Sequence, residues 1–381
     1  MTVHIVQPAL PPYRIALFKH LQRELSRRNE SLRVYASPRD HLGVVSVPPV
    51  EFEARVDSTM SAHLGGRAFW QKKLNVPLVS GDVLVINGNP RLLSNYPVWL
   101  RAKLLGVPVV WWGHGWSAGS HGHRSRVRQR IMRAADALLL YTDKEREEYV
   151  GLGFAPDRTF ALNNGLDIES IEKAIGEWDA GRTRAFRQAN GLDTCAHWCI
   201  FVGRLSSKSR VGLLIESLPT IRADVGLIIL GDGPLAAEAK ETASRLGLCS
   251  RIIWAGAQFD ERANAPWMLS ASAFTYPGAV GLSLIHGFAY GLPAVVHGNG
   301  SEHMPEFAAF ENYGNGLAFE CGSASSLARK INELFENHER LAAMSEQALA
   351  LVHRTFNVAD MTRRFLQVID SLSLRSPGWS E

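Results

Sequence analysis

Two cations close to a glycine form the first group of residues that could do chemistry. Gly203 and Arg204 follow an apolar run over 199–202, and Lys208 comes four residues after Arg204. A glycine lets a ligand approach the backbone, and cations at the carboxyl end of a parallel strand can bind a diphosphate. The same segment is equally compatible with a solvated loop between a strand and a helix, because exposed Arg and Lys are common.

Residues 276–306 form a second candidate site, in which a loop of small residues precedes a helix. Gly278 and Gly281 fall in this loop, the helix is predicted over 282–290, and the apolar run 292–297 predicts a buried parallel strand. The first backbone N–H groups of a helix have no partner within it, so they favour an anion such as a phosphate. The helix would begin with Leu282 and Ser283.

Two further turns place polar residues beside glycines. Gly231 and Gly233 follow an apolar run, and a purely structural tight turn explains them as well as a ligand site does. His114 lies between two glycines after another apolar run. A histidine on such a permissive backbone is placed for contact with a ligand, although a structural histidine in an aromatic patch has the same sequence signature.

Apolar runs and helical patterns alternate along the chain and would place these residues at the ends of strands. The alternation predicts parallel pairing and doubly wound α/β domains. A polar stretch over 168–197 separates two such series, and 381 residues exceed what one core usually serves. We therefore predict two domains with a boundary near Asp167, and a helix over 211–221 in the second.

Together these segments resemble the donor-binding region of the two-domain (GT-B) glycosyltransferases of family 4, the glycosyl transferases group 1. The resemblance is carried by Gly-Arg-Leu at 203–205, by the turn at 231–234 and above all by the segment 276–306, which follows at the family's usual distance. It implies an α/β fold of two Rossmann-like doubly wound domains facing a central cleft.

The resemblance also implies how the domains are divided. Residues 1–167 would form an acceptor domain, and residues 168–357 a nucleotide-sugar donor domain. The last helix, within 358–381, would pack back on the acceptor domain. The turn at 163–167, Asn-Asn-Gly-Leu-Asp, resembles the family's junction between domains and is interpreted as a hinge element.

The same resemblance assigns roles to single residues. It implies that Arg204 and Lys208 stabilise the leaving diphosphate and that His114 faces the donor sugar from the first domain. The family's usual lysine position falls on Ser209, so either Lys208 or Arg210 could reach that phosphate, and Lys208 is favoured. The predicted donor-binding residues are Gly203, Gly231, Gly233, Gly278, Gly281, Leu282, Ser283, His286 and Glu306.

The sequence departs from the family at two positions. Members usually carry two glutamates eight positions apart, which bind the sugar and the ribose, but Gly278 and His286 stand there. His286 can hydrogen-bond a ribose hydroxyl, or it can be a buried core residue. Either the donor is held differently, through Glu302 or Glu306, or activity has been lost.

The function implied is transfer of a sugar from a nucleotide-diphosphate sugar to a hydroxyl of a glycan or lipid-linked glycan in surface polysaccharide or lipopolysaccharide synthesis. The resemblance implies retention at the anomeric carbon, and the sequence has no Asp-x-Asp pair, which favours a metal-independent reaction without a cofactor. A GDP-linked hexose or deoxyhexose is a first guess for the donor. A nucleotide-sugar epimerase of the same fold and a non-catalytic partner of another transferase are the alternatives.

Composition limits the class of ligand and the cellular compartment that we expect. A formal net charge of +4 does not indicate nucleic acid, and the four cysteines lack the spacing of a zinc site or a disulfide scaffold. We therefore expect a cytoplasmic protein. The basic stretch 121–133, with Ile131 and Met132, and the segment 68–74 predict peripheral contact with an anionic membrane at its inner face, or a solvated surface.

Overall fold

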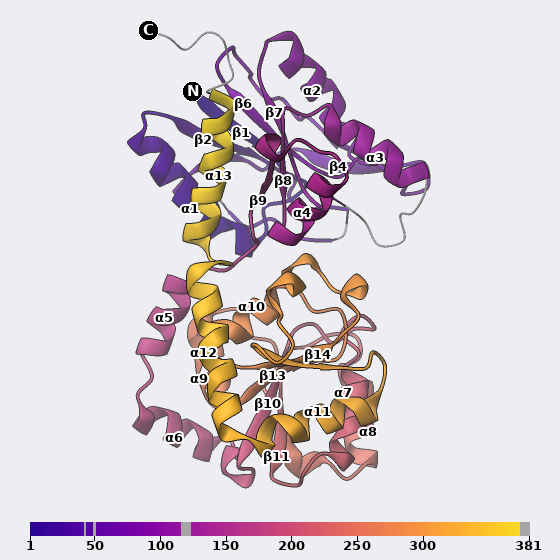
Figure 1. Cartoon of the computed structure of the whole chain (residues 1–381), viewed down its shortest axis with the longest axis vertical. Coiled ribbons are helices and arrows are strands. Elements are labelled where there is room, and N and C mark those ends of the chain that lie inside the picture. Colours follow the sequence, from indigo (N-terminus) through magenta and orange to yellow (C-terminus); the bar gives the residue numbers. More distant parts are fainter. Residues whose placement is uncertain (42, 49–50, 116–122, 374–381) are drawn as a thin grey trace. The chain divides into compact units, whose positions relative to one another are not determined.

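The structure is a computed structural model that describes residues 1–41, 43–48, 51–115 and 123–373. It divides into two compact units (Figure 1). The first unit comprises Met1–Asn164 together with the chain from Val358, and the second comprises Gly165–Asn357.

The first unit is built on a seven-stranded sheet in the order β3-β2-β1-β6-β7-β8-β9. Every neighbouring pair in this sheet is parallel. The strands are β1 (Thr2–Val6), β2 (Ser31–Tyr35), β3 (Glu53–Arg55), β6 (Val83–Asn87), β7 (Val109–Trp112), β8 (Ala137–Leu140) and β9 (Thr159–Ala161). A separate antiparallel pair consists of β4 (Thr59–His63) and β5 (Ala68–Lys72).

Helices cover the first sheet, and one of them comes from the far end of the chain. They are α1 (Pro12–Arg27), α2 (Asn95–Leu104), α3 (His123–Arg133), α4 (Asp143–Gly151) and α13 (Val358–Ser373). Helix α13 lies beside α1 (Figure 1). Its Phe365 ring packs on the Trp112 ring at 5.9 Å between centroids, and Arg364 pairs with Asp143 at 2.8 Å. The predicted helix within 358–381 is thus seen as far as Ser373, and 374–381 lie outside the described residues.

The second unit is built on a six-stranded sheet in the order β12-β11-β10-β13-β14-β15, again with parallel neighbours throughout. The strands are β10 (His197–Val202), β11 (Val225–Leu230), β12 (Ile252–Trp254), β13 (Ala273–Tyr276), β14 (Ala294–His297) and β15 (Gly316–Phe319). The helices are α5 (Ile168–Gly176), α6 (Ala180–Ala189), α7 (Val211–Ser217), α8 (Ala236–Arg245), α9 (Glu261–Leu269), α10 (Leu282–Ala289), α11 (Ala324–Glu336) and α12 (His338–Arg354).

The predicted doubly wound α/β class is confirmed by these two parallel sheets. Most of their strands are buried apolar runs, as parallel strands covered on both faces require, whereas the edge strand β3 is largely exposed. The predicted helix over 211–221 is shorter than expected, because α7 ends at Ser217 and a 3₁₀ turn over Leu218–Thr220 contains Pro219. Among the described residues, no helix is long and apolar enough to cross a membrane.

Strand order fixes where a ligand can bind in the second sheet. From β10 the chain winds outward through β11 and β12, and then returns to β13 on the other side of β10. The loops after β10 and β13 therefore flank the point at which the winding direction reverses. In open α/β sheets the ligand crevice lies at this point, at the carboxyl ends of the strands.

Candidate functional site

Glycines let the loops after β10 and β11 meet at the carboxyl edge of the second sheet. Gly203 follows β10, and Gly231 and Gly233 follow β11. A Cβ atom on Gly231 would overlap the carbonyl oxygen of Gly203, and one on Gly233 would overlap that of Leu205. The Leu205 N–H also donates to the Asp232 carbonyl at 2.9 Å. Only glycine permits so close an approach, so these positions hold the loops together.

The loop after β13 rests directly on the segment that carries Lys208. A Cβ atom on Gly278 would overlap the Lys208 carbonyl oxygen, and the Ala279 N–H donates to that oxygen at 3.0 Å. Ser209, at the family's usual lysine position, is fully buried, and its hydroxyl donates to the Ser206 carbonyl at 2.8 Å. The structure therefore brings Gly203, Lys208 and Gly278 together at one edge.

Arg204 and Lys208 present free cations at this edge. Both side chains are exposed, and neither makes a hydrogen bond or an ion pair with any residue that the structure describes. Arg210 differs, because its guanidinium donates to Glu302 at 2.6 Å and to Cys321 at 3.0 Å. Of the two cations considered for the second phosphate contact, Lys208 is thus the unengaged one.

Helix α10 begins at the same edge, immediately after Gly281. No side chain caps it, and its first residues, Leu282 and Ser283, are half-buried. A Cβ on Gly281 would lie 3.2 Å from the Met304 side chain and 3.5 Å from the Glu306 carboxylate, which is buried. Loop 278–281 and Glu306 are therefore neighbours, and the start of α10 adds a positive dipole end.

His286 points into a small polar cluster formed with another helix. Its Nε2 lies 2.8 Å from Oε1 of Glu261, the first residue of α9, and the Tyr290 hydroxyl donates to the same oxygen at 2.5 Å. Burial would raise the pKa of the Glu261 carboxyl, but the hydrogen bonds from His286 and Tyr290 outweigh it and hold the pKa below its usual value. Burial raises the pKa of the Tyr290 hydroxyl, and the adjacent Glu261 raises it further.

Glu261 is a carboxylate that the sequence interpretation missed. It lies against α10 beside the position where the resembled family has its second glutamate, although it comes from a helix 25 residues earlier in the chain. The only local signal is Asp260-Glu261 at a helix start after a strand, which is also typical of ordinary capping; indeed the Asp260 side chain accepts from the Arg262 N–H.

His114 lies at the carboxyl edge of the first sheet, directly after β7 and Gly113. Its ring packs edge-on against Tyr141 at 4.4 Å, and its Nδ1 lies 3.7 Å from the Glu145 carboxylate. Glu145 is buried and accepts the backbone N–H of Tyr141 at 2.9 Å and that of Gly115 at 3.3 Å. His114 is about one-third exposed (37%), so its orientation is fixed while one face remains open.

A buried cation lies close to this histidine and was not predicted. The Arg14 guanidinium lies over the Trp112 ring at 4.6 Å and over the Tyr141 ring at 5.7 Å. It also donates to the Asn164 side chain at 3.2 Å. Residues 116–122, which include the start of the basic stretch 121–133, lie outside the described residues.

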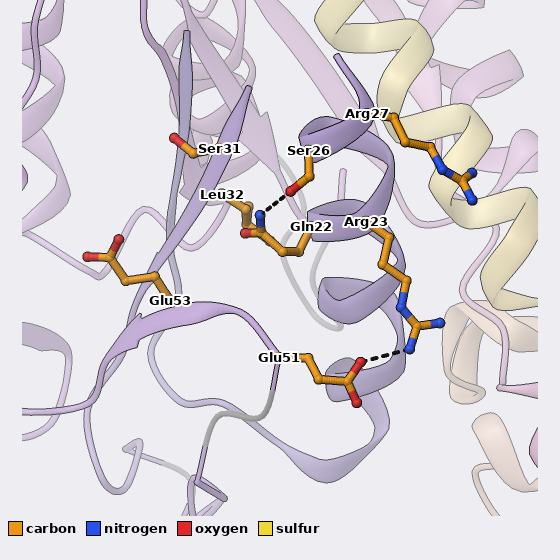
Figure 2. Close-up of a pocket in the computed structure, with 8 residues that line it drawn as sticks. All are labelled: Gln22, Arg23, Ser26, Arg27, Ser31, Leu32, Glu51 and Glu53. Carbon is orange, nitrogen blue, oxygen red and sulfur yellow. Dashed lines mark hydrogen bonds and ion pairs between the residues drawn. The ribbon is translucent and has the colours of Figure 1, made fainter. Parts of the chain in front are cut away.

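A groove of about 690 Å³ in the first unit lies at the amino edge of its sheet, not at the carboxyl edge where such sheets bind ligands. Figure 2 shows it between α1 and the first residues of β2 and β3. Its lining charges are engaged in ion pairs: Arg23 pairs with Glu51 at 2.7 Å, and Glu53 pairs with Arg33 at 2.8 Å. The amino ends of parallel strands are not where α/β sheets bind ligands, so we assign no role to it.

Two doubly wound α/β units of this kind constitute the GT-B fold of glycosyltransferases. Residues 183–350 match the family model of the glycosyl transferases group 1. The crystal structure of Anabaena Alr3699/HepE in complex with UDP is similar, with a TM-score of 0.70, 17% identity, and coverage of 97% of this chain and 99% of that one. A glycosyltransferase from Rickettsia africae ESF-5 gives a TM-score of 0.75 at 14% identity, covering 99% of both chains.

One curated relative is the lipopolysaccharide core biosynthesis mannosyltransferase LpsB of Rhizobium meliloti (strain 1021). The two sequences are 25% identical over 221 residues, which is 55% of this chain and 60% of LpsB. Across the curated relatives, the alignments span from 32% to 60% of the relative's length, less than two thirds in each case.

Proposed function

We propose that this chain is a glycosyltransferase that moves a sugar from a nucleoside-diphosphate sugar to a hydroxyl of a glycan or lipid-linked glycan. One observation carries the proposal: Arg204 and Lys208 are exposed and unengaged on glycine-packed loops, at the winding reversal of the second sheet. The family match over 183–350, which includes both cations, supports it.

Electrostatics would supply most of the catalysis. As the bond to the anomeric carbon breaks, negative charge grows on the departing diphosphate. Arg204 and Lys208 stabilise that charge without a metal ion, and the backbone N–H groups at the start of α10 add to it. Such groups are effective because they are already in place before the reaction begins.

His114 is proposed to donate a hydrogen bond to the donor sugar. Glu145 and Tyr141 hold its ring, so little conformational freedom of the imidazole is lost when the sugar binds. We propose that the reaction retains the anomeric configuration, as the family resemblance implies.

Glu261 is proposed to replace the carboxylate that the family carries at the position of His286. A carboxylate can accept hydrogen bonds from two hydroxyls, whereas the His286 Nε2 is already engaged with Glu261. Hydrogen bonds from His286 and Tyr290 keep Glu261 ionised, with its side chain 22% exposed and therefore open to a ligand. A ribose hydroxyl is the group we expect it to bind.

The acceptor is proposed to be a surface glycan or its lipid-linked precursor. The rhizobial relative is named for lipopolysaccharide core biosynthesis, which supports this class of acceptor. The HepE structure contains UDP, which supports a nucleoside diphosphate as the leaving group of the donor. UDP is therefore the first nucleotide to test beside GDP.

The decisive experiment is calorimetric titration of the purified chain with UDP, GDP, dTDP and CMP, followed by product analysis with the tightest nucleotide's sugars. Binding of one diphosphate and acceptor-dependent release of nucleotide are expected. The double variant Arg204→Ala/Lys208→Ala should lose binding, and the matched surface variant Lys173→Ala/Arg245→Ala should keep it.

The same experiment separates the alternatives. Conversion of the sugar without an acceptor would support a nucleotide-sugar epimerase. Failure to bind any of the four nucleotides would support a non-catalytic partner and refute the transferase.

We also propose that the basic face of α3 attracts an anionic membrane. Arg126, Arg130 and Arg133 are exposed, but Met132 is fully buried in the unit's own core, so the attraction would be electrostatic and not by insertion. Flotation with phosphatidylglycerol liposomes at low salt, and its loss at raised salt, is the expected result. No binding at either salt concentration would remove this proposal.

A further inference from the structure

Three side chains in the second unit combine the chemistry of a transition-metal site. His297 ends β14, Glu302 lies in a 3₁₀ turn over Gly300–Glu302, and Cys321 follows β15. One ligand atom from each lies within 4.8 Å of the other two. Because β14 and β15 are neighbours in parallel register, with His297 opposite Phe319, all three residues lie at the carboxyl edge of the sheet.

The unpartnered ring nitrogens of buried His297 point to a ligand. Its side chain is completely buried, yet neither ring nitrogen makes a hydrogen bond of normal geometry. The backbone of Gly278 interacts with the ring only weakly. Buried polar atoms almost always have a partner, and a metal ion would provide one.

The neighbouring His303, by contrast, has a hydrogen-bond partner at each ring nitrogen. Its ring also fixes the orientation of the His297 ring. The two rings stack at 3.8 Å between centroids. His303 Nδ1 accepts the Val280 N–H at 3.1 Å, so its Nε2 carries the proton and donates to the His297 carbonyl at 2.8 Å. With both nitrogens engaged, His303 is a supporting residue and His297 is the candidate ligand.

Arg210 engages the other two residues when no metal is bound. Its guanidinium bonds Glu302 and Cys321 but leaves His297 without a partner. Its side chain is 38% exposed and can swing into solvent when a divalent cation takes over its role. An exposed ion pair of this kind contributes little stability, so it is readily exchanged for metal–ligand bonds.

We propose that His297, Glu302 and Cys321 bind a zinc-class divalent cation, with the Arg210 side chain displaced. The Cys321 thiol would release its proton to water and form the sulfur–metal bond as a thiolate, and water would fill the fourth position. Ligand atoms around tetrahedral zinc lie about 3.3–3.8 Å apart. Cys321 Sγ already lies 3.7 Å from Glu302 Oε1, and all three ligand atoms lie within 4.8 Å of one another, so the side chains must move closer together to bind the ion.

Cobalt(II) is the probe that tests this site, because a thiolate ligand gives it a charge-transfer band that nitrogen and oxygen ligands do not. The metal-free full chain should bind one Co²⁺ with this band, and Zn²⁺ should displace the cobalt. Cys321→Ser should lose the band and weaken binding by more than about 100-fold, because loss of even an outer partner of a ligand costs 10–100-fold. The matched variant Cys249→Ser, at an exposed cysteine elsewhere, should behave like the parent chain.

Arg210→Gln gives an independent test that leaves all three ligands in place. Because no guanidinium must then be displaced, Co²⁺ should bind more tightly than to the parent chain. The proposal is overturned if the parent chain shows no thiolate band, or if the band survives in Cys321→Ser. These measurements involve no nucleotide or sugar, so their outcome is independent of the transferase proposal.

Discussion

The carboxyl edges of the two sheets use their cations in different ways. In the first unit Arg14 is buried over the Trp112 ring and bonded to Asn164. In the second unit Arg204 and Lys208 are exposed and have no described partner. Charges engaged by the protein stabilise its own structure, whereas unengaged charges are available to a ligand. Substitution of the cation at the first edge should therefore lower stability, whereas substitution of the cations at the second edge should lower activity.

The largest effect should come from removing a free cation. Arg204→Ala is expected to lower kcat/KM by about 10²–10³, the usual loss when one group that stabilises transition-state charge is removed. The thermal midpoint should stay unchanged, because the side chain makes no contact that the fold needs. Steady-state kinetics and calorimetry measure both, with Arg245→Ala as the control. Full activity of Arg204→Ala would contradict a role for this cation in binding the ligand.

A substitution at the glycine contact should impair both stability and binding. Gly231→Ala places a methyl group against the Gly203 carbonyl, and overpacking of this kind costs about 1–3 kcal/mol. The loops after β10 and β11 would separate, so nucleotide binding should weaken as well. Gly113→Ala, whose Cβ would lie 2.9 Å from Gly88 Cα, should cost similar stability in urea unfolding.

A control glycine makes this prediction sharper. Gly212 lies within α7, and a Cβ atom at this position would meet no other atom within 4 Å. Gly212→Ala should therefore stabilise the chain by about 0.5–1 kcal/mol, because alanine is the better helix former. If Gly231→Ala proves as harmless as Gly212→Ala, the loops do not meet as described.

The engaged cation of the first unit should show the opposite behaviour to Arg204. Arg14→Ala removes a desolvated cation–π contact and a buried hydrogen bond, and should cost about 2 kcal/mol of unfolding free energy. Urea unfolding measures the loss, and nucleotide affinity measured by calorimetry should change little. A stable Arg14→Ala variant with weakened nucleotide binding would reverse the assignment of the two edges.

Acid is expected to remove the contribution of Glu261 to stability. The folded-state pKa of Glu261 is depressed, so its stabilising contribution is present above the unfolded-state pKa of about 4.3 and is lost as pH falls through the folded-state value. Glu261→Gln should therefore lose about 1 kcal/mol near neutral pH and less in acid. Unfolding midpoints measured from pH 7 down to pH 3 should converge for the two proteins; a constant gap would contradict the assignment.

The fold could be predicted from the sequence because its signals are local. Buried apolar runs, helical spacing and glycines directly after strands each occupy a few consecutive residues, and parallel strands bring their carboxyl ends to one edge. The local pattern predicted one boundary wrongly, because Pro219 lies in the 3₁₀ turn at which α7 has already ended.

The missed residues act through contacts between distant segments. Glu261 on α9 contacts His286 on α10, and Arg14 on α1 contacts Trp112 on β7. His297, Glu302 and Cys321 come together from three loops, which no cysteine spacing could indicate. Met132 shows the converse, since an apolar residue on a basic helix can face the core as well as a membrane.

The unengaged state of Arg204 and Lys208 has a consequence for turnover. Two cations that bind a diphosphate while the bond to the sugar breaks also bind it after the sugar has left. The spent nucleotide should therefore compete with fresh donor, and its escape should set the pace of successive cycles. Inorganic pyrophosphate, which offers the same charges without a base, should inhibit as well, so assays call for a phosphatase that removes the by-product.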